Sequence, residues 1–398
     1  MILEPQRESF DGLEGHITYL NCAYMSPQLR ASVAAAKRAL SRRSKPWQIA
    51  AEDFFREPEE SRRLFARLVG GDPDGVALVP AASYGIAVAA GNLRTGPGGR
   101  ILVLEEEFPS NYYAWAELAE RTGAKLETVR HPADHDWTSA VLERLDGRVD
   151  VIAAPNCHWT DGSLLDLERV GEEARRAGAA LVVDATQSLG ARPLDVRRVR
   201  PDFLVASAYK WLLGPYGMAF LWVAEERREG RPIEHNWINR AGSEDFSGLA
   251  GYAAAFQPGA RRYDAGERSN FILLPMANAA LRRLLEWGVK NISETLGLLT
   301  DLAEEGAGEL GLLPVPRGRR ARHMIGLRLP GGEAAGVAGR LAEQGIFVSA
   351  RGACLRVSPH LYNTREDVLR LLDALSRELR RRGYPALIRS TLDQGRNS

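Results

Sequence analysis

The sequence predicts an α/β protein with a mainly parallel sheet between helices, followed by a smaller α+β region. Short apolar runs alternate with longer amphipathic segments through the middle of the chain, which is the pattern of βαβ units. After about residue 266 the pattern changes to long helical segments followed by short strands. The 398 residues leave room for roughly two to three domains of ~100–200 residues each.

Helices are expected between the strands of the larger region. The clearest is LDLERVGEEARRAG at Leu165–Gly178, where apolar residues recur at helical spacing and a glycine closes the segment. Two others are expected at Tyr84–Leu93 and Asn111–Thr122. The strands are predicted near Val76–Val79, Ile101–Leu104, Val149–Ala153, Ala180–Asp184, Phe203–Ala206 and Met218–Trp222.

The smaller region is predicted to end on a strand, a turn and a helix. Asn363, Thr364 and Glu366 stand where a helix of this kind is capped. Before it come the helical segments Leu274–Trp287 and Ile292–Gly308 and short strands at His323–Leu329 and Ile346–Ser349. We therefore divide the chain into an N-terminal segment (1–18), a large domain (19–265), a small domain (266–388) and a flexible tail (389–398).

Composition and charge exclude several classes of partner. A formal net charge of +1 gives no strong field for nucleic acid or an anionic membrane surface. The three cysteines lack C-x-x-C spacing, so neither a disulfide framework nor a zinc site is indicated. The N-terminus lacks the basic start and apolar run of a signal peptide, and no stretch of ~18 apolar residues occurs. We expect a soluble cytoplasmic protein whose partner is a small molecule.

The fragment HPADH holds two histidines, His131 and His135, four residues apart. Pro132 lies between them and argues against a helical pair of metal ligands. We expect a surface loop at this place and no metal site in the protein.

Lys210 is the residue that most needs a functional explanation. It lies in the apolar run SAYKWLLGPYGMAFLWV and is one of only five lysines among 52 basic residues. Burying an ammonium group without a partner costs several kcal/mol. Burial also lowers the pKa of a lysine, and the resulting neutral amine can form a Schiff base with an aldehyde.

Other polar residues also follow predicted strands. Asp184, Asn156 and Ser207 end apolar runs, and Ser83 stands where a helix begins. Ligands of parallel sheets bind outside the carboxyl ends of the strands, so these groups are expected to converge. A buried carboxylate suits a protonated ring nitrogen, and a helix N-terminus suits a phosphate. Pyridoxal 5′-phosphate combines the aldehyde, the ring nitrogen and the phosphate.

These motifs resemble those of the aminotransferase class V group of fold-type I pyridoxal-phosphate-dependent enzymes, which includes cysteine desulfurases, kynureninases and isopenicillin N epimerase-like proteins. The likeness extends from YLNCAYMSP at Tyr19–Pro27 to RVSPHLYNTREDV at Arg356–Val368. Its strongest motifs are VVDATQSLG and SAYKWLLGPYG, which contain Asp184 and Lys210. The resemblance implies the fold-type I fold and pyridoxal 5′-phosphate as cofactor.

The resemblance also implies roles for individual residues. Lys210 matches the Schiff-base lysine and Asp184 the partner of the ring nitrogen, and these two are the expected catalytic residues. The other expected cofactor contacts are Gln187 and Asn156 near the phenolic oxygen, Phe108 on the ring, and Ala82, Ser83, Ser207 and Tyr209 at the phosphate.

Three residues are expected to contact the substrate. Arg356 matches the arginine that binds the substrate carboxylate, and its guanidinium group fits a carboxylate well. Tyr24 and His158 are expected to shape the pocket, although a structural role for His158 fits the sequence equally well. The segment RRYDAGERSN at Arg261–Asn270 resembles a loop that reaches the neighbouring subunit, which implies a homodimer with active sites at the interface.

The reaction itself stays open at this stage. A freed lysine can move the Cα proton of a small amino acid or amino-acid conjugate. Transamination is our working interpretation, and β-elimination by a C–S lyase or a cysteine desulfurase-like reaction is the alternative. Desulfuration needs a thiolate on a mobile loop, but Cys354 lies in the same predicted strand as Arg356. A second alternative is a sensor that binds pyridoxal phosphate without turnover.

Overall fold

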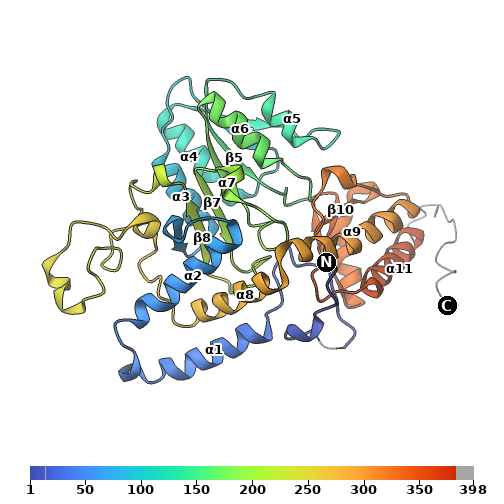
Figure 1. Cartoon of the computed structure of the whole chain (residues 1–398). Helices are drawn as coiled ribbons and strands as arrows, with labels where there is room; N and C mark the ends of the chain where they lie inside the picture. The colour runs from blue at the N-terminus through green and yellow to red at the C-terminus, as the bar shows by residue number, and fades with distance from the viewer. Residues whose placement is uncertain (14, 382–398) are drawn as a thin grey trace.

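A seven-stranded sheet lies at the centre of the larger part of the molecule (Figure 1). The computed structural model describes residues 1–13 and 15–381, so the predicted tail at 389–398 and the end of the small domain at 388 lie outside the described residues. The strand order is β2-β8-β7-β6-β5-β3-β4. The strands are β2 (Val76–Val79), β3 (Arg100–Leu104), β4 (Lys125–Val129), β5 (Val149–Pro155), β6 (Ala180–Asp184), β7 (Phe203–Ser207) and β8 (Ala219–Val223).

Strand β8 runs antiparallel to both of its neighbours, whereas the other pairs of this sheet are parallel. Only residues 208–218 connect β7 to β8, and a crossover between parallel neighbours needs about a dozen residues or more. The chain therefore turns back directly after β7. This turn carries Lys210 past the carboxyl ends of β5, β6 and β7.

The structure adds strand β4 to the six strands that the sequence predicts. It lies at the edge of the sheet and pairs with β3 alone. Lys125 and Thr128 are exposed on it, and only Val129 is buried. An edge strand of this kind lacks the continuous apolar run that marks a buried parallel strand, so the sequence gives little sign of it.

Helices cover both faces of the sheet. Side chains alternate between the two faces along a strand, so Val103 and Val182 pack with α3 and α4, whereas Leu102 and Val183 pack with α2, α6 and α8. These two apolar layers fix the positions of the strand ends. The helices are α2 (Asp53–Val69), α3 (Ala82–Asn92), α4 (Tyr113–Thr122), α6 (Leu167–Ala177) and α8 (Leu273–Trp287).

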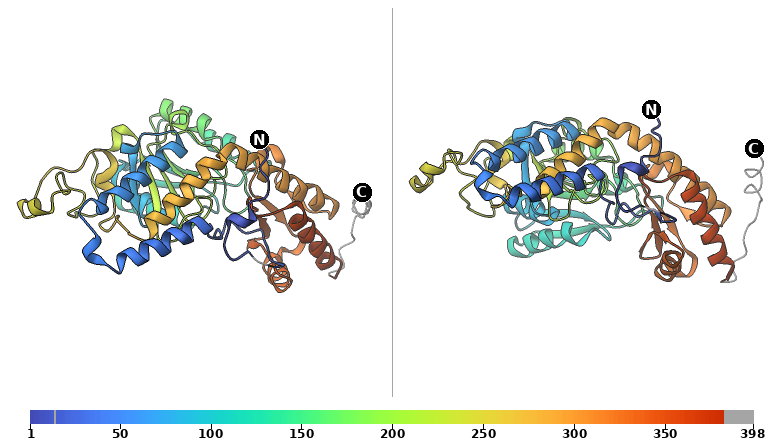
Figure 2. Two further views of the ribbon diagram at one scale, coloured as in Figure 1. Left: turned by 60° about the horizontal axis from the view of Figure 1, so that its bottom comes forward. Right: turned by 90° about the horizontal axis from the view of Figure 1, so that it is seen from below.

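The C-terminal part contains a four-stranded antiparallel sheet with the order β12-β13-β10-β9, beside helices α9 and α11 (Figures 1 and 2). A separate parallel pair, β1 with β11, brings the start of the chain to this part. These strands are β1 (Thr18–Tyr19), β9 (Leu313–Pro314), β10 (Ile325–Arg328), β11 (Ile346–Phe347), β12 (Ser349–Arg351) and β13 (Cys354–Val357). The remaining helices are α1 (Arg30–Arg43), α5 (Trp137–Leu142), α7 (Val196–Val199), α9 (Val289–Glu309), α10 (Ala334–Glu343) and α11 (Arg365–Arg381).

Part of the segment 235–258 extends away from the body of the molecule, although Ile238, Asn239 and Gln257 within it are buried, and we call the whole range the projecting segment (Figure 2). Its only helical stretch is the 3₁₀ turn Phe246–Gly251. Large apolar side chains on this segment face solvent, and Tyr252 is 89% exposed, with Trp237 and Phe246 also exposed. Exposed aromatic side chains gathered in one place are typical of a surface that contacts another protein.

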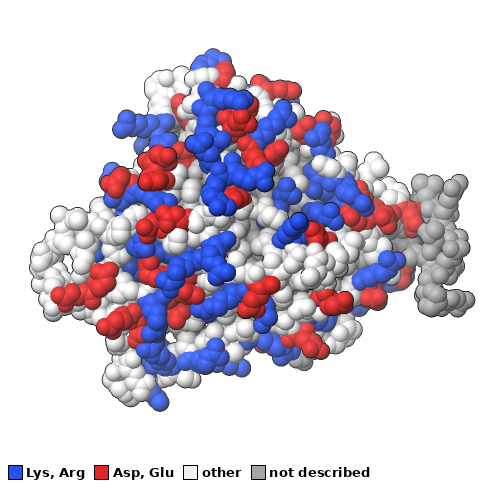
Figure 3. Space-filling view, viewed as in Figure 1, with Lys and Arg blue, Asp and Glu red and all other residues white. Residues whose placement is uncertain are grey.

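The surface of the molecule carries both signs of charge. Basic and acidic side chains are interspersed over the face in Figure 3, in keeping with the formal net charge of +1. Among the described residues, no helix combines the length and the apolar character that crossing a bilayer requires.

Candidate active site

A cavity lies at the carboxyl ends of β5, β6 and β7, beside the start of α3. Eight of the residues that the sequence predicts for the cofactor line it together: Ala82, Ser83, Phe108, Asp184, Gln187, Ser207, Tyr209 and Lys210. Segments far apart in the sequence therefore meet here, as expected for strand ends of a parallel sheet.

The amino group of Lys210 is buried in this cavity without a direct ion pair. The residue is 6% exposed, and its Nζ forms no hydrogen bond or ion pair with any residue that the structure describes. Its nearest aromatic neighbours are Phe108 and Tyr209, whose ring centroids lie 5.3 and 5.5 Å from Nζ. Desolvation, reinforced by the positive charge of Arg356, lowers the pKa of Lys210 to about 8, although Asp184 acts in the opposite direction.

Asp184 ends strand β6 and points into the same cavity. Its Oδ1 accepts a hydrogen bond from the backbone N–H of Thr186 at 2.9 Å. The Oγ1 of Thr186 in turn accepts the backbone N–H of Ser207 at 3.1 Å, which joins the ends of β6 and β7. Burial raises the pKa of Asp184 despite the hydrogen bonds from Thr186 and the charge of Lys210. A cationic group in the cavity would stabilise its ionised form.

The N-terminus of α3 forms another wall of the cavity. The backbone N–H groups of Ala82 and Ser83 have no acceptor in the part of the chain that the structure describes. Ser207 and Tyr209 line the cavity with them. Free N–H groups at the positive end of a helix dipole, with neighbouring hydroxyls, form a suitable site for a phosphate.

Gln187 and Asn156 differ in how they meet the cavity. Gln187 lines it, and its side chain donates to the carbonyl of Ala23 at 3.1 Å and accepts from Trp211 at 3.1 Å. Asn156 lies behind the lining residues, where its Nδ2 donates to the carbonyl of Leu165 at 3.2 Å. Its Oδ1 is buried, and the described residues provide no donor for it.

Arg356 lies on β13 and is 1% exposed, although it does not line the cavity itself. Its Nη1 donates to the carbonyl oxygen of Trp159 at 2.7 Å. Its Nε and Nη2 are buried and have no hydrogen-bond partner among residues 1–13 and 15–381. Trp159 does line the cavity and packs edge-on against Phe108, with ring centroids 5.4 Å apart. The guanidinium group thus lies directly behind one wall of the cavity with unused donors.

The two remaining residues predicted for the substrate do not line the cavity. Tyr24 is 56% exposed. His158 is fully buried, where its ring stacks on Trp137 at a centroid distance of 5.3 Å. Its Nδ1 pairs with Thr160 Oγ1 at 2.7 Å and its Nε2 with the carbonyl of Glu105 at 3.0 Å. The structure therefore gives His158 the contacts of a structural residue, which was the second of the two interpretations.

Sequence reasoning missed Glu107, a buried carboxylic acid that lines the cavity. Its Oε1 accepts the backbone N–H of Phe108 at 2.7 Å, and its Oε2 has no partner among the described residues. Burial, together with the charge of Asp184, raises the pKa of Glu107 to about 8. The sequence did contain an indication of this residue, because Glu107 follows strand β3 much as Asp184 ends strand β6.

Comparisons with known proteins agree with this geometry. A family model described as aminotransferase class-V matches residues 25–371. An uncharacterized aminotransferase, YcbU, of Bacillus subtilis is 28% identical over 391 residues, covering 94% of this chain and 97% of that protein. Isopenicillin N epimerase of Streptomyces clavuligerus is 28% identical over 331 residues, covering 79% of this chain and 83% of the epimerase.

Solved structures resemble the whole fold. The apo structure of a cysteine desulfurase from Thermococcus onnurineus NA1 superposes with a TM-score of 0.82 at 21% identity, covering 96% of this chain and 100% of the other. The predicted fold-type I architecture is confirmed. Because the family model matches most of this chain, the chain belongs to the aminotransferase class-V family and is a pyridoxal-phosphate-dependent enzyme.

Proposed function

We propose that this enzyme transfers the amino group of a small amino acid or amino-acid conjugate, with Lys210 as the residue that bonds the cofactor and moves the proton at Cα. The observation that carries the proposal is the buried amine of Lys210, which lacks a direct ion pair among the described residues and shares a cavity with Asp184. Burying an amine without an ion pair costs free energy of folding, so its presence in a cavity indicates a functional role. The lowered pKa makes the neutral, nucleophilic form of the amine available.

The residues of the cavity fit pyridoxal 5′-phosphate. The unpaired N–H groups of Ala82 and Ser83 would bind the phosphate, with help from Ser207 and Tyr209. Asp184 would hold a proton on the ring nitrogen, and the ring of Phe108 would stack on the cofactor. We further propose Gln187 and Asn156 for the phenolic oxygen, because each carries an amide beside or directly behind the cavity.

The bound cofactor supplies an electron sink for the bond that breaks at Cα of the amino acid. Lys210 performs the proton transfer, since an amine with a pKa of about 8 can both accept and return a proton near neutral pH. Asp184 would hold a proton on the ring nitrogen, and its own burial would strengthen this electrostatic interaction. Phe108 and Trp159, which line the cavity and contact each other, would limit the access of water to a bound substrate.

Arg356 is our proposed site for the substrate carboxylate. Its Nε and Nη2 lack partners, so a carboxylate that enters past Trp159 would satisfy two buried donors at once. This contact would orient Cα toward Lys210. Tyr24 remains a proposed substrate contact.

Desulfuration fits the chain less well than transamination. Cys354 is the first residue of β13, is 8% exposed and has a raised thiol pKa caused mainly by desolvation. The nucleophile in that reaction is a thiolate that must travel to the substrate sulfur. A protonated thiol fixed in a strand meets neither requirement. Cys22 and Cys157 are also free, buried and raised in pKa by burial.

A homodimer and a cytoplasmic location complete the proposal. The three cysteines are free, which suits a reducing compartment. The exposed aromatic side chains of the projecting segment suit contact with a second copy of the chain. Arg262 and Ser269 belong to the segment Arg261–Asn270, which is expected to reach the neighbouring subunit. Within one chain, Ser269 donates to the carbonyl of Phe54, and Arg262 donates to the carbonyl of Gly230 at 3.2 Å.

The test is a panel of amino acids and cysteine conjugates added to the purified holoenzyme. A keto acid from the substrate, with turnover that requires a keto-acid acceptor, is the expected result. Pyruvate with ammonia would identify β-elimination instead, and sulfide from cysteine would identify desulfuration. As the matched variant, Cys354→Ala is expected to keep the transaminase rate within about two-fold of wild type, because the buried Cys354 does not line the cavity. A shifted absorbance band with no product from any member of the panel would contradict the proposal.

A further inference from the structure

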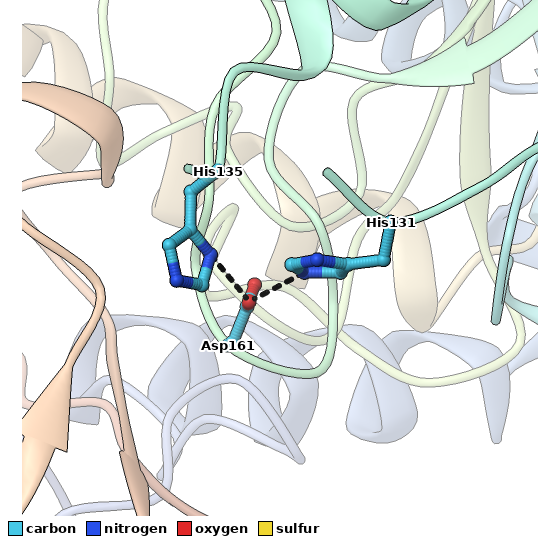
Figure 4. A group of neighbouring side chains, drawn as sticks. All are labelled: His131, His135 and Asp161. Carbon is cyan, nitrogen blue, oxygen red and sulfur yellow. Dashed lines mark hydrogen bonds and ion pairs between the residues drawn. The ribbon is translucent and has the colours of Figure 1, made fainter. Parts of the chain in front are cut away.

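Two histidines and one aspartate meet outside the cavity, on the loops that follow β4 and β5 (Figure 4). His131 Nε2 lies 3.2 Å from Asp161 Oδ2, and His135 Nδ1 lies 3.8 Å from the same oxygen. The three atoms all lie within 4.8 Å of one another. The HPADH fragment is a loop, and the loop brings both rings to one carboxylate without the helix that Pro132 forbids.

We propose that His131, His135 and Asp161 bind a Zn²⁺ ion. Zinc bonds to imidazole nitrogen and carboxylate oxygen are about 2.0–2.1 Å long, so ligand atoms at the corners of a tetrahedron are about 3.3 Å apart. The 3.2 Å separation of His131 Nε2 from Asp161 Oδ2 already matches this spacing, and the 3.8 Å separation of His135 Nδ1 would shorten by about half an ångström on binding. Water would complete the tetrahedron, because both rings are partly exposed, with 26% of each side chain open to solvent.

The surroundings of the ligand atoms resemble the outer shell of a metal centre. The Nδ1 of His131 pairs with the carbonyl of Pro132 at 3.1 Å, which as a donor would leave Nε2 unprotonated and directed at Asp161. Asp161 Oδ1 accepts from the backbone N–H and the hydroxyl of Ser163, at 2.9 and 2.7 Å. These contacts fix both ligands and leave Oδ2 facing the two rings.

The ring of His135 packs edge-on against that of His131, with centroids 5.1 Å apart. The Nδ1 of His135, however, is buried and has no hydrogen-bond partner within the described part of the chain. Its backbone is left-handed, with φ of 60°, which a residue other than glycine adopts at a cost. A metal ion would satisfy the buried nitrogen and account for a conformation that holds the ring against Asp161.

The proposed ion would join two loops, and one of these loops is hydrogen-bonded to the C-terminal sheet. The loop with His131 and His135 follows the edge strand β4, and Asp161 belongs to the loop that also carries Trp159, a wall of the cavity. The backbone carbonyl of Asp161 accepts the N–H of Gly326 on β10 at 2.9 Å. Zinc at this place would therefore stabilise one wall of the active site and its contact with the C-terminal sheet.

The experiment is a titration of the holoenzyme, purified without a histidine tag and treated with a chelator, with Zn²⁺ in a calorimeter near neutral pH. One ion per chain is expected for wild type. His135→Ala and Asp161→Asn should each weaken binding by about 100-fold or more, since even outer-shell changes cost 10–100-fold. His16→Ala removes an exposed histidine outside the cluster and should bind as wild type does.

A second measurement protects the result against misfolding. Zn²⁺ should raise the melting temperature of wild type and of His16→Ala but not of His135→Ala, while all three give the same circular dichroism spectrum. Anomalous diffraction from crystals soaked in Zn²⁺ should place the ion between the three ligand atoms. No binding to wild type, or binding that His135→Ala and Asp161→Asn leave unchanged, would overturn the proposal and leave a hydrogen-bonded His131–Asp161 pair as the explanation.

Discussion

At the scale of single residues, the amine of Lys210 gives the sharpest expectation. Lys210→Ala should abolish the visible absorbance band of the bound cofactor, because no other described lysine lies in the cavity. Lys37→Ala, which changes an exposed lysine on α1, should leave the spectrum unchanged. Absorbance of the purified proteins checks this. An unaltered band in Lys210→Ala would contradict the assignment.

The lowered pKa of Lys210 predicts how cofactor capture depends on pH. Only the neutral amine reacts, and the neutral fraction grows as pH rises through the pKa, so the rate at which the apoprotein captures pyridoxal phosphate should rise with a midpoint near 8. Arg356→Leu removes a positive charge that lowers this pKa, so the midpoint should move upward, toward the 10.5 of an ordinary lysine. Stopped-flow absorbance over a pH series measures it. A midpoint that moves downward would show that the two charges are not coupled as described.

The sequence predicts where residues that end strands lie, but it does not predict which way an individual side chain points. Asp184, Ser207 and Lys210 were predictable, because the carboxyl ends of parallel strands meet at one edge. The orientation of His158 was not predictable, because a histidine at this place could face the cavity or, as in the structure, turn toward Thr160 and Glu105. Glu107 was hidden among three successive acids in EEEFPSN, of which only the last lines the cavity.

At the scale of elements, a buried ion cluster joins α2, β2 and the segment after residue 263. Both side chains of the Arg62–Asp264 pair are fully buried. Asp264 Oδ1 also accepts the backbone N–H of Leu78 at 2.7 Å, and Arg268 Nε lies 2.7 Å from its Oδ2. One carboxylate therefore holds two buried guanidinium groups and the start of the central sheet.

Asp264→Asn should destabilise the protein by about 3–5 kcal/mol, because it leaves buried positive charge without compensation. Urea unfolding followed by circular dichroism measures the change in free energy. Asp245→Asn, at an exposed cap of a 3₁₀ turn, is the control and should cost about 1 kcal/mol or less. Equal losses in the two variants would refute the importance given to the buried cluster.

Elements with one strong pattern were predicted closely, and those with a weak pattern were not. The predicted strands Val76–Val79 and Ala180–Asp184 coincide with β2 and β6, since both strands are buried and apolar along almost their whole length. The predicted strand Ile346–Ser349 divides into β11 and the start of β12, which pair with different partners. Pairing partners far away in the chain cannot be recognised from local apolar pattern.

At the scale of the whole molecule, the projecting segment predicts a dimer. Sedimentation of the wild-type holoenzyme should give twice the mass of the chain. Replacing Trp237 and Tyr252 together by serine should shift the equilibrium toward monomer, because two exposed aromatic side chains are typical anchors of an interface. Tyr113→Ser, at an exposed tyrosine on α4, is the matched control. A fully active wild-type monomer would contradict the proposed assembly.

The general architecture was predictable from the sequence, whereas the boundaries between its domains were less so. The alternation of strands and helices gave the central sheet, and the family match confirms the class V assignment. The boundaries at 18, 265 and 388 remain predictions. Helices α1 and α2, before the first predicted strand, were not foreseen, because no strand pattern on their N-terminal side frames them as part of a βαβ unit.

The pairing of β1 with β11 has a consequence for the synthesis of the protein. Thr18 leaves the ribosome early, yet its partner Ile346 is made near the end of translation. The first segment must therefore wait, unpaired, until almost the whole chain has emerged. A nascent chain that stalls before that point cannot pair β1 with β11. It would expose Leu20 and its buried neighbours to chaperones and proteases.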